Sequence, residues 1–218
     1  MAVCVQASVP RAADASRWAK DRMKTERRTV EADSVTFEIL WAAAKQQVQA
    51  SETFPKRAKF FHLSGLFLTF LTVEAYANHL GELLFPDEWK NAQRTFGRGS
   101  EYPGVLGKIR FLADRCGVPF DQDSPPYSTI RELKSLRDTI AHGRTKRIRQ
   151  EIDVPEGEHP PLLIPDWHSK VTWDFLSLCM KDAKALIEQL NNAARRTFPE
   201  EYDIDEYVLI GFFGSQIG

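Results

Sequence analysis

Residues 60–84 read FFHLSGLFLTFLTVEAYANHLGELL, and this apolar stretch decides the fold. The segment from about Lys56 to Leu84 holds no proline and is apolar nearly all round, which is typical of the central helix of an α-helical domain. Its longest uncharged part, Phe60 to Val73, is shorter than the roughly 20 residues that a bilayer-spanning helix needs. We therefore expect a buried core helix and no association with a membrane.

Helical patterns continue on both sides of this segment. Residues 14–50 are rich in helix-forming residues and contain neither proline nor glycine. Further helices are expected at 87–96, around 105–113, and in a segment that ends at Gly143. The last helix is expected from Ser169, as its N-cap, to Arg196. The predicted fold is all-α, with four to five main helices, short extra helices and an extended segment before the last helix. We expect a disordered N-terminus at 1–13, one helical domain at 14–198 and an acidic, then apolar, tail at 199–218.

The composition restricts the function classes. The chain has 218 residues and a net charge of -1, so bulk charge does not identify a partner. Three widely spaced cysteines favour a reducing compartment and no disulfide framework, and they lack zinc-type spacing. The N-terminus does not resemble a signal peptide, so a cytoplasmic location is expected. The glycines between 97 and 104 match no phosphate-binding loop, and we expect neither a metal nor a cofactor.

A second stretch, LKSLRDTIAHGR at residues 133–144, gathers polar groups at the end of a helix. Gly143 is expected to end this helix in the left-handed conformation that a C-cap needs. Arg137, Asp138 and His142 cluster at that end, and Asp138 and His142 are four apart, so their side chains can meet. Basic residues follow directly: Arg144, Lys146, Arg147 and Arg149.

This helix end resembles the Arg-x4-6-His signature of the HEPN family, small helical proteins of bacterial toxin–antitoxin, phage-defence and RNA-processing systems. The family often places a polar residue directly after the arginine, and Asp138 holds that position here. The spacing by itself is not specific, because Arg57 and His62 also satisfy it. Arg137 and His142 are favoured as the motif because a polar residue follows the arginine, because they lie at a helix end, and because basic residues come directly after them. The resemblance implies a HEPN-like helical bundle.

Glu74 and Asn78, four apart inside the apolar helix, are a second point of resemblance, because the second helix of many HEPN proteins carries a Glu-x3-Asn pair. A carboxylate in so apolar a helix is costly without a partner. Glu74 either reaches the edge of the protein or bonds a neighbouring helix. The functional alternative is that Glu74 or Asn78 orients Arg137 or His142.

The chemistry of the motif points to RNA cleavage without a metal, in which the RNA's own 2′-hydroxyl attacks the adjacent phosphate. His142 would be the general acid or base and Arg137 the phosphate clamp, while Asp138 could orient the imidazole ring. The four basic residues after the motif would attract the RNA backbone. The resemblance implies a homodimer in which two motifs face each other across one cleft. It also allows for an antitoxin or another partner protein.

Other interpretations remain open from the residues. A histidine at a helix end is usually a surface residue, and an adjacent Arg–Asp pair is usually a solvated ion pair of small value. Some family members are non-catalytic modules that bind a partner protein or a nucleotide. A helical protein that binds nucleic acid without cutting it is a third alternative, in which His142 would have no role.

Overall fold

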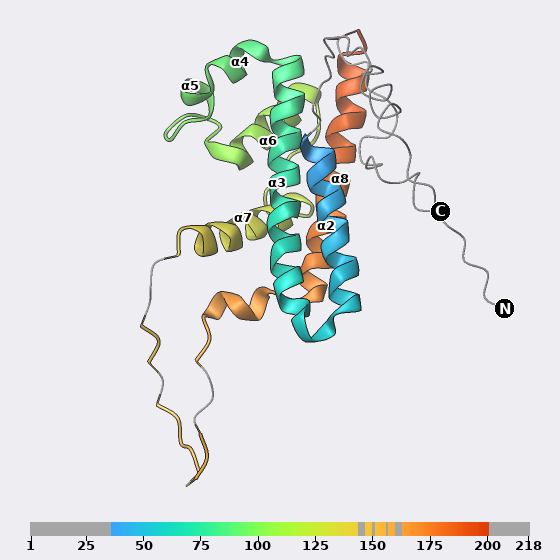
Figure 1. The fold of residues 1–218 in the computed structure, drawn as a ribbon. Coiled ribbons are helices and arrows are strands. Elements are labelled where there is room, and N and C mark those ends of the chain that lie inside the picture. Colours follow the sequence, from blue (N-terminus) through green and yellow to red (C-terminus); the bar gives the residue numbers. More distant parts are fainter. Residues whose placement is uncertain (1–35, 144–146, 150, 156, 160–162, 201–218) are drawn as a thin grey trace, which may run out of the picture. The chain divides into compact units, whose positions relative to one another are not determined.

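The computed structural model describes residues 36–143, 147–149, 151–155, 157–159 and 163–200. These residues belong to one compact unit, 35–218. In this part of the chain there are seven α-helices, two short 3-10 helices and no strand (Figure 1). The all-α class predicted from the sequence is confirmed. The predicted disordered segment 1–13 and residues 201–218 of the predicted tail lie outside the described residues.

Three long helices run side by side in Figure 1: α2 (Thr36–Thr53), α3 (Ala58–Leu84) and α8 (Trp173–Thr197). A 3-10 turn, η1 (Pro55–Arg57), joins α2 to α3 as a hairpin. Two medium helices, α6 (Gly104–Cys116) and α7 (Tyr127–Ala141), pack against α3 and α8. The remaining elements are short: α4 (Pro86–Lys90), α5 (Ala92–Phe96) and η2 (Asp166–Lys170).

The core is built around α3, as the apolar stretch predicts. Leu66, Phe70, Val73, Tyr76 and Leu80 follow one another at intervals of three or four, and each is at most 1% exposed. Such spacing puts them on one face of the helix. α3 contacts α2, α4, α6, α7 and α8, so its position determines where the motif helix α7 lies.

By length and composition alone, the helical segment Pro55–Leu84 could cross a membrane, and it is the one such segment in the described residues. The core helix of a globular bundle meets the same two criteria. The packing of five helices against α3 is what we expect of a core helix.

Several predicted helix ends differ from the structure. Residues 87–96 form two helices rather than one, because α4 ends at Lys90 and α5 begins at Ala92. The last helix begins at Trp173, not at Ser169. Its N-cap is Thr172, whose hydroxyl accepts a hydrogen bond from the Phe175 amide at 3.2 Å. Ser169 lies in η2, the short 3-10 helix that precedes α8.

Gly143 was expected to end its helix in a left-handed conformation, and that reason is wrong. α7 ends at Ala141, His142 is the C-cap, and Gly143 is not among the glycines with a positive φ. A Cβ added at Gly143 would lie 3.0 Å from the Thr139 carbonyl oxygen and 3.1 Å from that of Ile140. Glycine is favoured because the backbone turns back closely over the last carbonyls of the helix, so a Cβ would have less room than usual. By contrast, Gly117 ends α6 with φ 68°, as a left-handed C-cap does.

Candidate functional site

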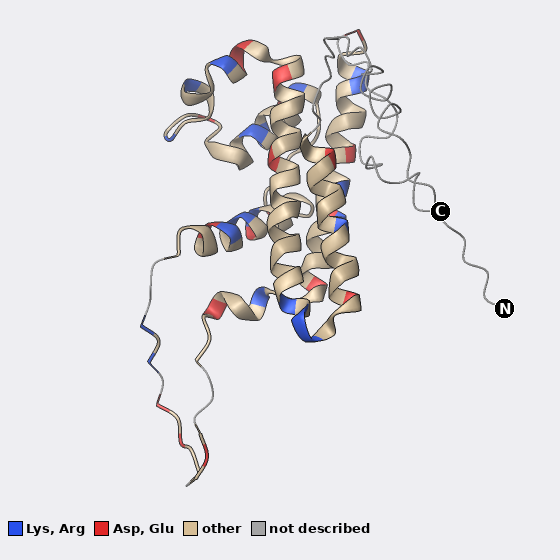
Figure 2. Ribbon diagram, viewed as in Figure 1, with Lys and Arg blue, Asp and Glu red and all other residues tan. Residues whose placement is uncertain are grey.

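The motif helix α7 is held by its apolar stripe. Ile130, Leu133 and Leu136 are buried against the core, while Arg137 and Asp138 are partly exposed at the edge of that contact. Figure 2 shows basic and acidic residues interspersed along the ribbon of α7. The 3.6-residue period therefore places the motif's polar groups beside the core and within reach of α3.

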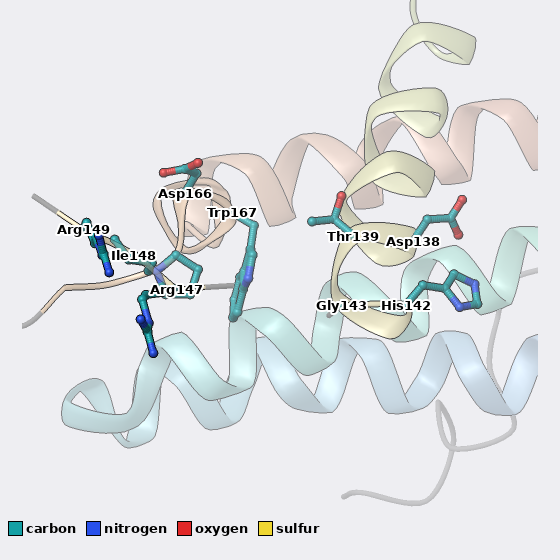
Figure 3. Close-up of a pocket in the computed structure, with 10 residues that line it drawn as sticks. Asp138, Thr139, His142, Gly143, Arg147, Ile148, Arg149, Asp166 and Trp167 are labelled. Carbon is teal, nitrogen blue, oxygen red and sulfur yellow. The ribbon is translucent and has the colours of Figure 1, made fainter. Parts of the chain in front are cut away.

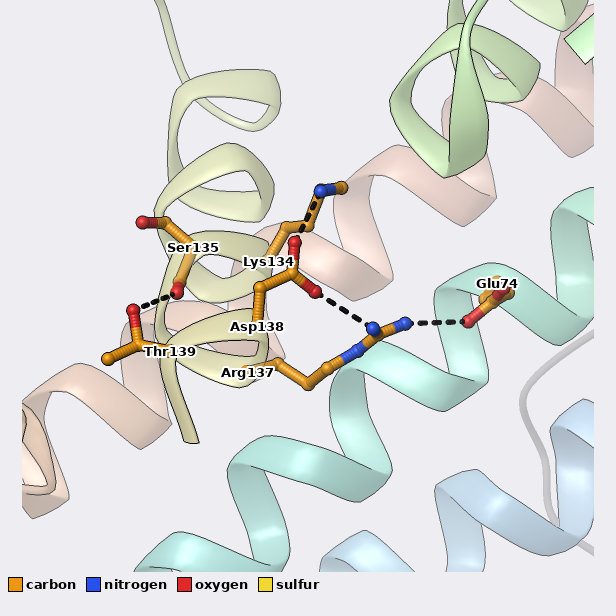
Figure 4. A network of polar contacts seen from close by, with 6 residues as sticks. All are labelled: Glu74, Lys134, Ser135, Arg137, Asp138 and Thr139. Atoms are coloured by element: carbon orange, nitrogen blue, oxygen red, sulfur yellow. Dashed lines mark hydrogen bonds and ion pairs between the residues drawn. The ribbon is translucent and has the colours of Figure 1, made fainter. Parts of the chain in front are cut away.

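Arg137 is anchored by two carboxylates and an aromatic ring. Its Nη1 donates to Asp138 Oδ1 at 2.8 Å, and its Nη2 donates to Glu74 Oε2 on α3 at 3.4 Å (Figure 4). The guanidinium carbon lies 4.6 Å from the centre of the Phe70 ring, within cation–π range. The sequence left open whether Glu74 reaches the edge of the protein or bonds a neighbouring helix. In the structure it bonds the neighbouring helix α7, and its partner there is Arg137. These contacts use two of the five N–H donors of the guanidinium.

Asp138 binds cations rather than the imidazole ring. Lys134, one turn earlier on α7, donates its Nζ to Asp138 Oδ2 at 2.5 Å, and Arg137 donates to the other oxygen. Burial by itself would raise the pKa of the Asp138 carboxyl. The hydrogen bond from Lys134, together with the charges of Lys134, Arg137 and His142, outweighs burial and holds that pKa below its ordinary value. With Glu74 added, the network contains two cations and two carboxylates and is formally neutral.

His142 is exposed and caps α7, with its backbone amide donating to the Asp138 carbonyl at 3.0 Å. In Figure 3 the side chains of His142 and Asp138 project to the same side of the helix end. A hollow of about 700 Å³ lies at this helix end, and Trp167 stands across it, on the side away from the direction in which these two side chains project (Figure 3). Its other lining residues are Thr139, Gly143, Arg147, Ile148, Arg149, Pro165 and Asp166.

The structure describes only some of the four basic residues that follow the motif. Arg147 and Arg149 are exposed and line the same hollow as His142, but in Figure 3 they lie beyond Trp167, away from the helix end. Arg144 and Lys146 lie outside the described residues. The lining of the hollow therefore includes His142, two arginines and Trp167, and in Figure 3 the imidazole of His142 points away from the other three.

Asn78 does not contact the motif, unlike its neighbour Glu74. Its Oδ1 accepts from Lys108 Nζ on α6 at 2.7 Å and from Trp89 Nε1 on α4 at 3.4 Å. The amide thus joins α3, α4 and α6 rather than orienting Arg137 or His142.

Three further residues belong to this region and were not singled out as site residues from the sequence. Lys134 could have been found from its spacing, because it stands four residues before Asp138. Trp167 carried no such signal, since it comes to the hollow from a segment 25 residues after His142 (167 − 142). The contact of Lys108 with Asn78 depends on the packing of α6 on α3, which spacing along the sequence does not reveal.

Comparison of the sequence with models of known protein families found no match, and searches among curated proteins and among solved structures found none either. Within the described residues, no group of three or more histidine, cysteine, aspartate and glutamate side chains is arranged to hold a metal ion. The chemistry of the site is therefore argued from its residues and their geometry.

Proposed function

We propose that the protein is a metal-independent endoribonuclease of the HEPN type, acting as a toxin or phage-defence effector in the cytoplasm. One observation carries the proposal: a single helix end presents an anchored guanidinium, Arg137, and an exposed imidazole, His142, beside a hollow with two more arginines. The sequence resemblance of this helix end and of the Glu74-x3-Asn78 pair to HEPN proteins supports the same function.

The proposed reaction uses groups that the site contains. His142 takes the proton of an RNA 2′-hydroxyl, whose oxygen then forms a bond to the adjacent phosphorus. The bond from phosphorus to the 5′-oxygen breaks, and a second imidazole protonates that leaving oxygen. Arg137 keeps three N–H donors beyond its contacts with Glu74 and Asp138, and these can stabilise the charge of the phosphorane. The products are a 2′,3′-cyclic phosphate and a 5′-hydroxyl.

A homodimer would supply the second imidazole, because each chain contributes one His142. An exposed stripe along α3 supports such a dimer. Phe60 is 73% exposed and Leu71 is 39% exposed, with half-buried Phe67 between them and Glu74 one turn beyond Leu71. These positions recur at intervals of seven, four and three, which is one face of a helix. A second copy seated on this stripe would lie next to the Arg137 network.

Purified protein should cut single-stranded RNA in excess chelator. The cleavage rate of His142→Ala should be at least about 100-fold lower than that of wild type, as expected when a general acid–base group is removed. His159→Ala, which removes an exposed histidine outside the site, is the matched control. Equal rates for wild type and His142→Ala would remove the catalytic assignment. Leu71→Glu should give monomers by light scattering and the same loss of cleavage.

A non-catalytic module that binds a partner protein or a nucleotide is the second candidate function. It is favoured by the neutral network, in which Glu74 and Asp138 already balance the charges of Arg137 and Lys134. The two functions differ in a simple measurement. A module would bind its partner equally well with histidine or alanine at position 142, and cells would tolerate its expression without an antitoxin.

A further inference from the structure

Asn78 and Lys108 form a second polar cluster, on the α3 turn that follows Glu74. The ammonium of Lys108 and the indole N–H of Trp89 both donate to Asn78 Oδ1, at 2.7 and 3.4 Å. Because both neighbours are donors, the amide oxygen must face them, and the amide NH2 group is turned away from them. Within the described residues, that NH2 group has no hydrogen-bond acceptor among protein atoms.

The positive charge of Lys108 is not balanced by a carboxylate. Lys134, Lys170 and Lys184 each pair with an acid, whereas no acidic oxygen in the described residues lies within ion-pair distance of Lys108 or of several exposed lysines such as Lys45 and Lys181. Its Nζ is instead held 5.9 Å from the Trp89 ring centre and 5.5 Å from that of Phe96. The side chain is half-buried, so its position is restricted.

A fixed ammonium and an adjacent amide NH2 group are a donor set suited to one phosphate. An ammonium has three donors, and the contact with Asn78 uses one of them. The cluster also lies in line with the proposed catalytic site. Glu74, which binds Arg137, and Asn78, which binds Lys108, are four residues apart, or roughly 6 Å along the helix.

We propose that Lys108 and Asn78 bind a second phosphate of the RNA strand, one turn of α3 away from the phosphate held by Arg137. This inference rests on the proposed function and extends it, because it gives the strand a direction across the molecule. The exposed Glu82 follows one turn after Asn78 and marks the end of this subsite, since a carboxylate repels the next phosphate.

The test measures binding of a fluorescent single-stranded RNA to full-length protein that carries His142→Ala, so that cleavage does not interfere. Adding Lys108→Met should lower the slope of log K against log salt by about 0.7, the value for one phosphate contact on a single strand, and should weaken binding about fivefold at 0.1 M salt. Lys108→Arg should restore both quantities. Lys184→Met, on the exposed side of α8, should change neither.

A second variant keeps the test informative if Lys108→Met is unstable. Asn78→Asp puts a carboxylate against Lys108, which retains the contact between α3 and α6 but neutralises the cation, and it should weaken binding as Lys108→Met does. A salt slope unchanged in folded Lys108→Met and Asn78→Asp proteins overturns the inference. AMP that binds as tightly as the strand, in a Lys108-dependent way, also overturns it, because the ligand would then be a free nucleotide.

The outcome is separable from that of the proposed function. A wild-type protein that cuts no RNA, but whose binding slope falls with Lys108→Met, supports the phosphate subsite while removing the nuclease. Cleavage that depends on His142, together with an unchanged salt slope in the Lys108 and Asn78 variants, leaves the nuclease in place and removes the subsite.

Discussion

Replacing Thr129 by valine should destabilise the protein by about 1.5–3 kcal/mol, the range for a hydrogen bond to a charged group. Thr129 lies on the motif helix α7 and Asp182 lies on α8, and each is 6% exposed. The Thr129 hydroxyl donates to Asp182 Oδ2 at 2.5 Å. Valine has nearly the same shape as threonine, so the substitution removes the donor without opening a cavity, and the buried carboxylate loses that hydrogen bond.

Urea unfolding followed by circular dichroism measures this loss. For a chain of this size, each kcal/mol lowers the melting temperature by about 2–4 °C, so Thr129→Val should melt roughly 3–12 °C lower. Thr139→Val is the matched control, because Thr139 is an exposed threonine of the same helix whose hydroxyl bonds only the Ser135 carbonyl. Its free energy of unfolding should change by no more than about 0.5 kcal/mol.

A double-mutant cycle identifies the partner. Asp182→Ala combined with Thr129→Val should be less destabilising than the sum of the single changes, by about 1 kcal/mol or more. Additive effects, or a Thr129→Val protein as stable as the Thr139→Val control, would refute the reasoning that this pair fastens the motif helix to the bundle.

Three further outcomes follow from the structure. Gly81→Ala should destabilise by about 1–3 kcal/mol because its Cβ would lie 2.0 Å from a Trp89 ring atom, whereas Gly65→Ala, 3.1 Å from flexible Leu176 methyl groups, should lose less; chemical denaturation compares them. Burial raises the pKa of the Cys116 thiol to about 11 and also raises that of Cys179, so a Cys4→Ser protein should react with a thiol reagent at pH 8 only as fast as it unfolds. The pKa of Asp138 is lower in the folded protein than the ordinary value of about 3.9, so its stabilising effect is complete above that pH and lost as the pH falls through the folded pKa. The gap in unfolding free energy between wild type and Asp138→Asn should therefore be present at pH 7 and shrink towards pH 3, and a gap that grows in acid would contradict this sign.

The local patterns of the sequence predicted most of the helices because helix formation depends on short-range spacing. The apolar run at 60–84 predicted α3, and the stripe through Ile130, Leu133 and Leu136 predicted α7. Helix ends were less predictable. Ser169 and Thr172 are both plausible N-caps, and only the path of the chain into η2 decides that Thr172 is used. Gly143 marked a helix end correctly, but by close approach to two carbonyls rather than by a left-handed conformation.

The sequence by itself determined that the described chain is helical, that α3 is its centre, and that Arg137, Asp138 and His142 share one helix end, because all three follow from spacing along a 3.6-residue period. Only the tertiary structure decided the partners of these groups. Asp138 binds Lys134 and Arg137 rather than His142, and Asn78 binds Lys108. Trp167 reaches the hollow from a later segment. These interaction partners depend on how the helices pack and on which charged groups are nearest in space, and spacing along the sequence does not determine those distances.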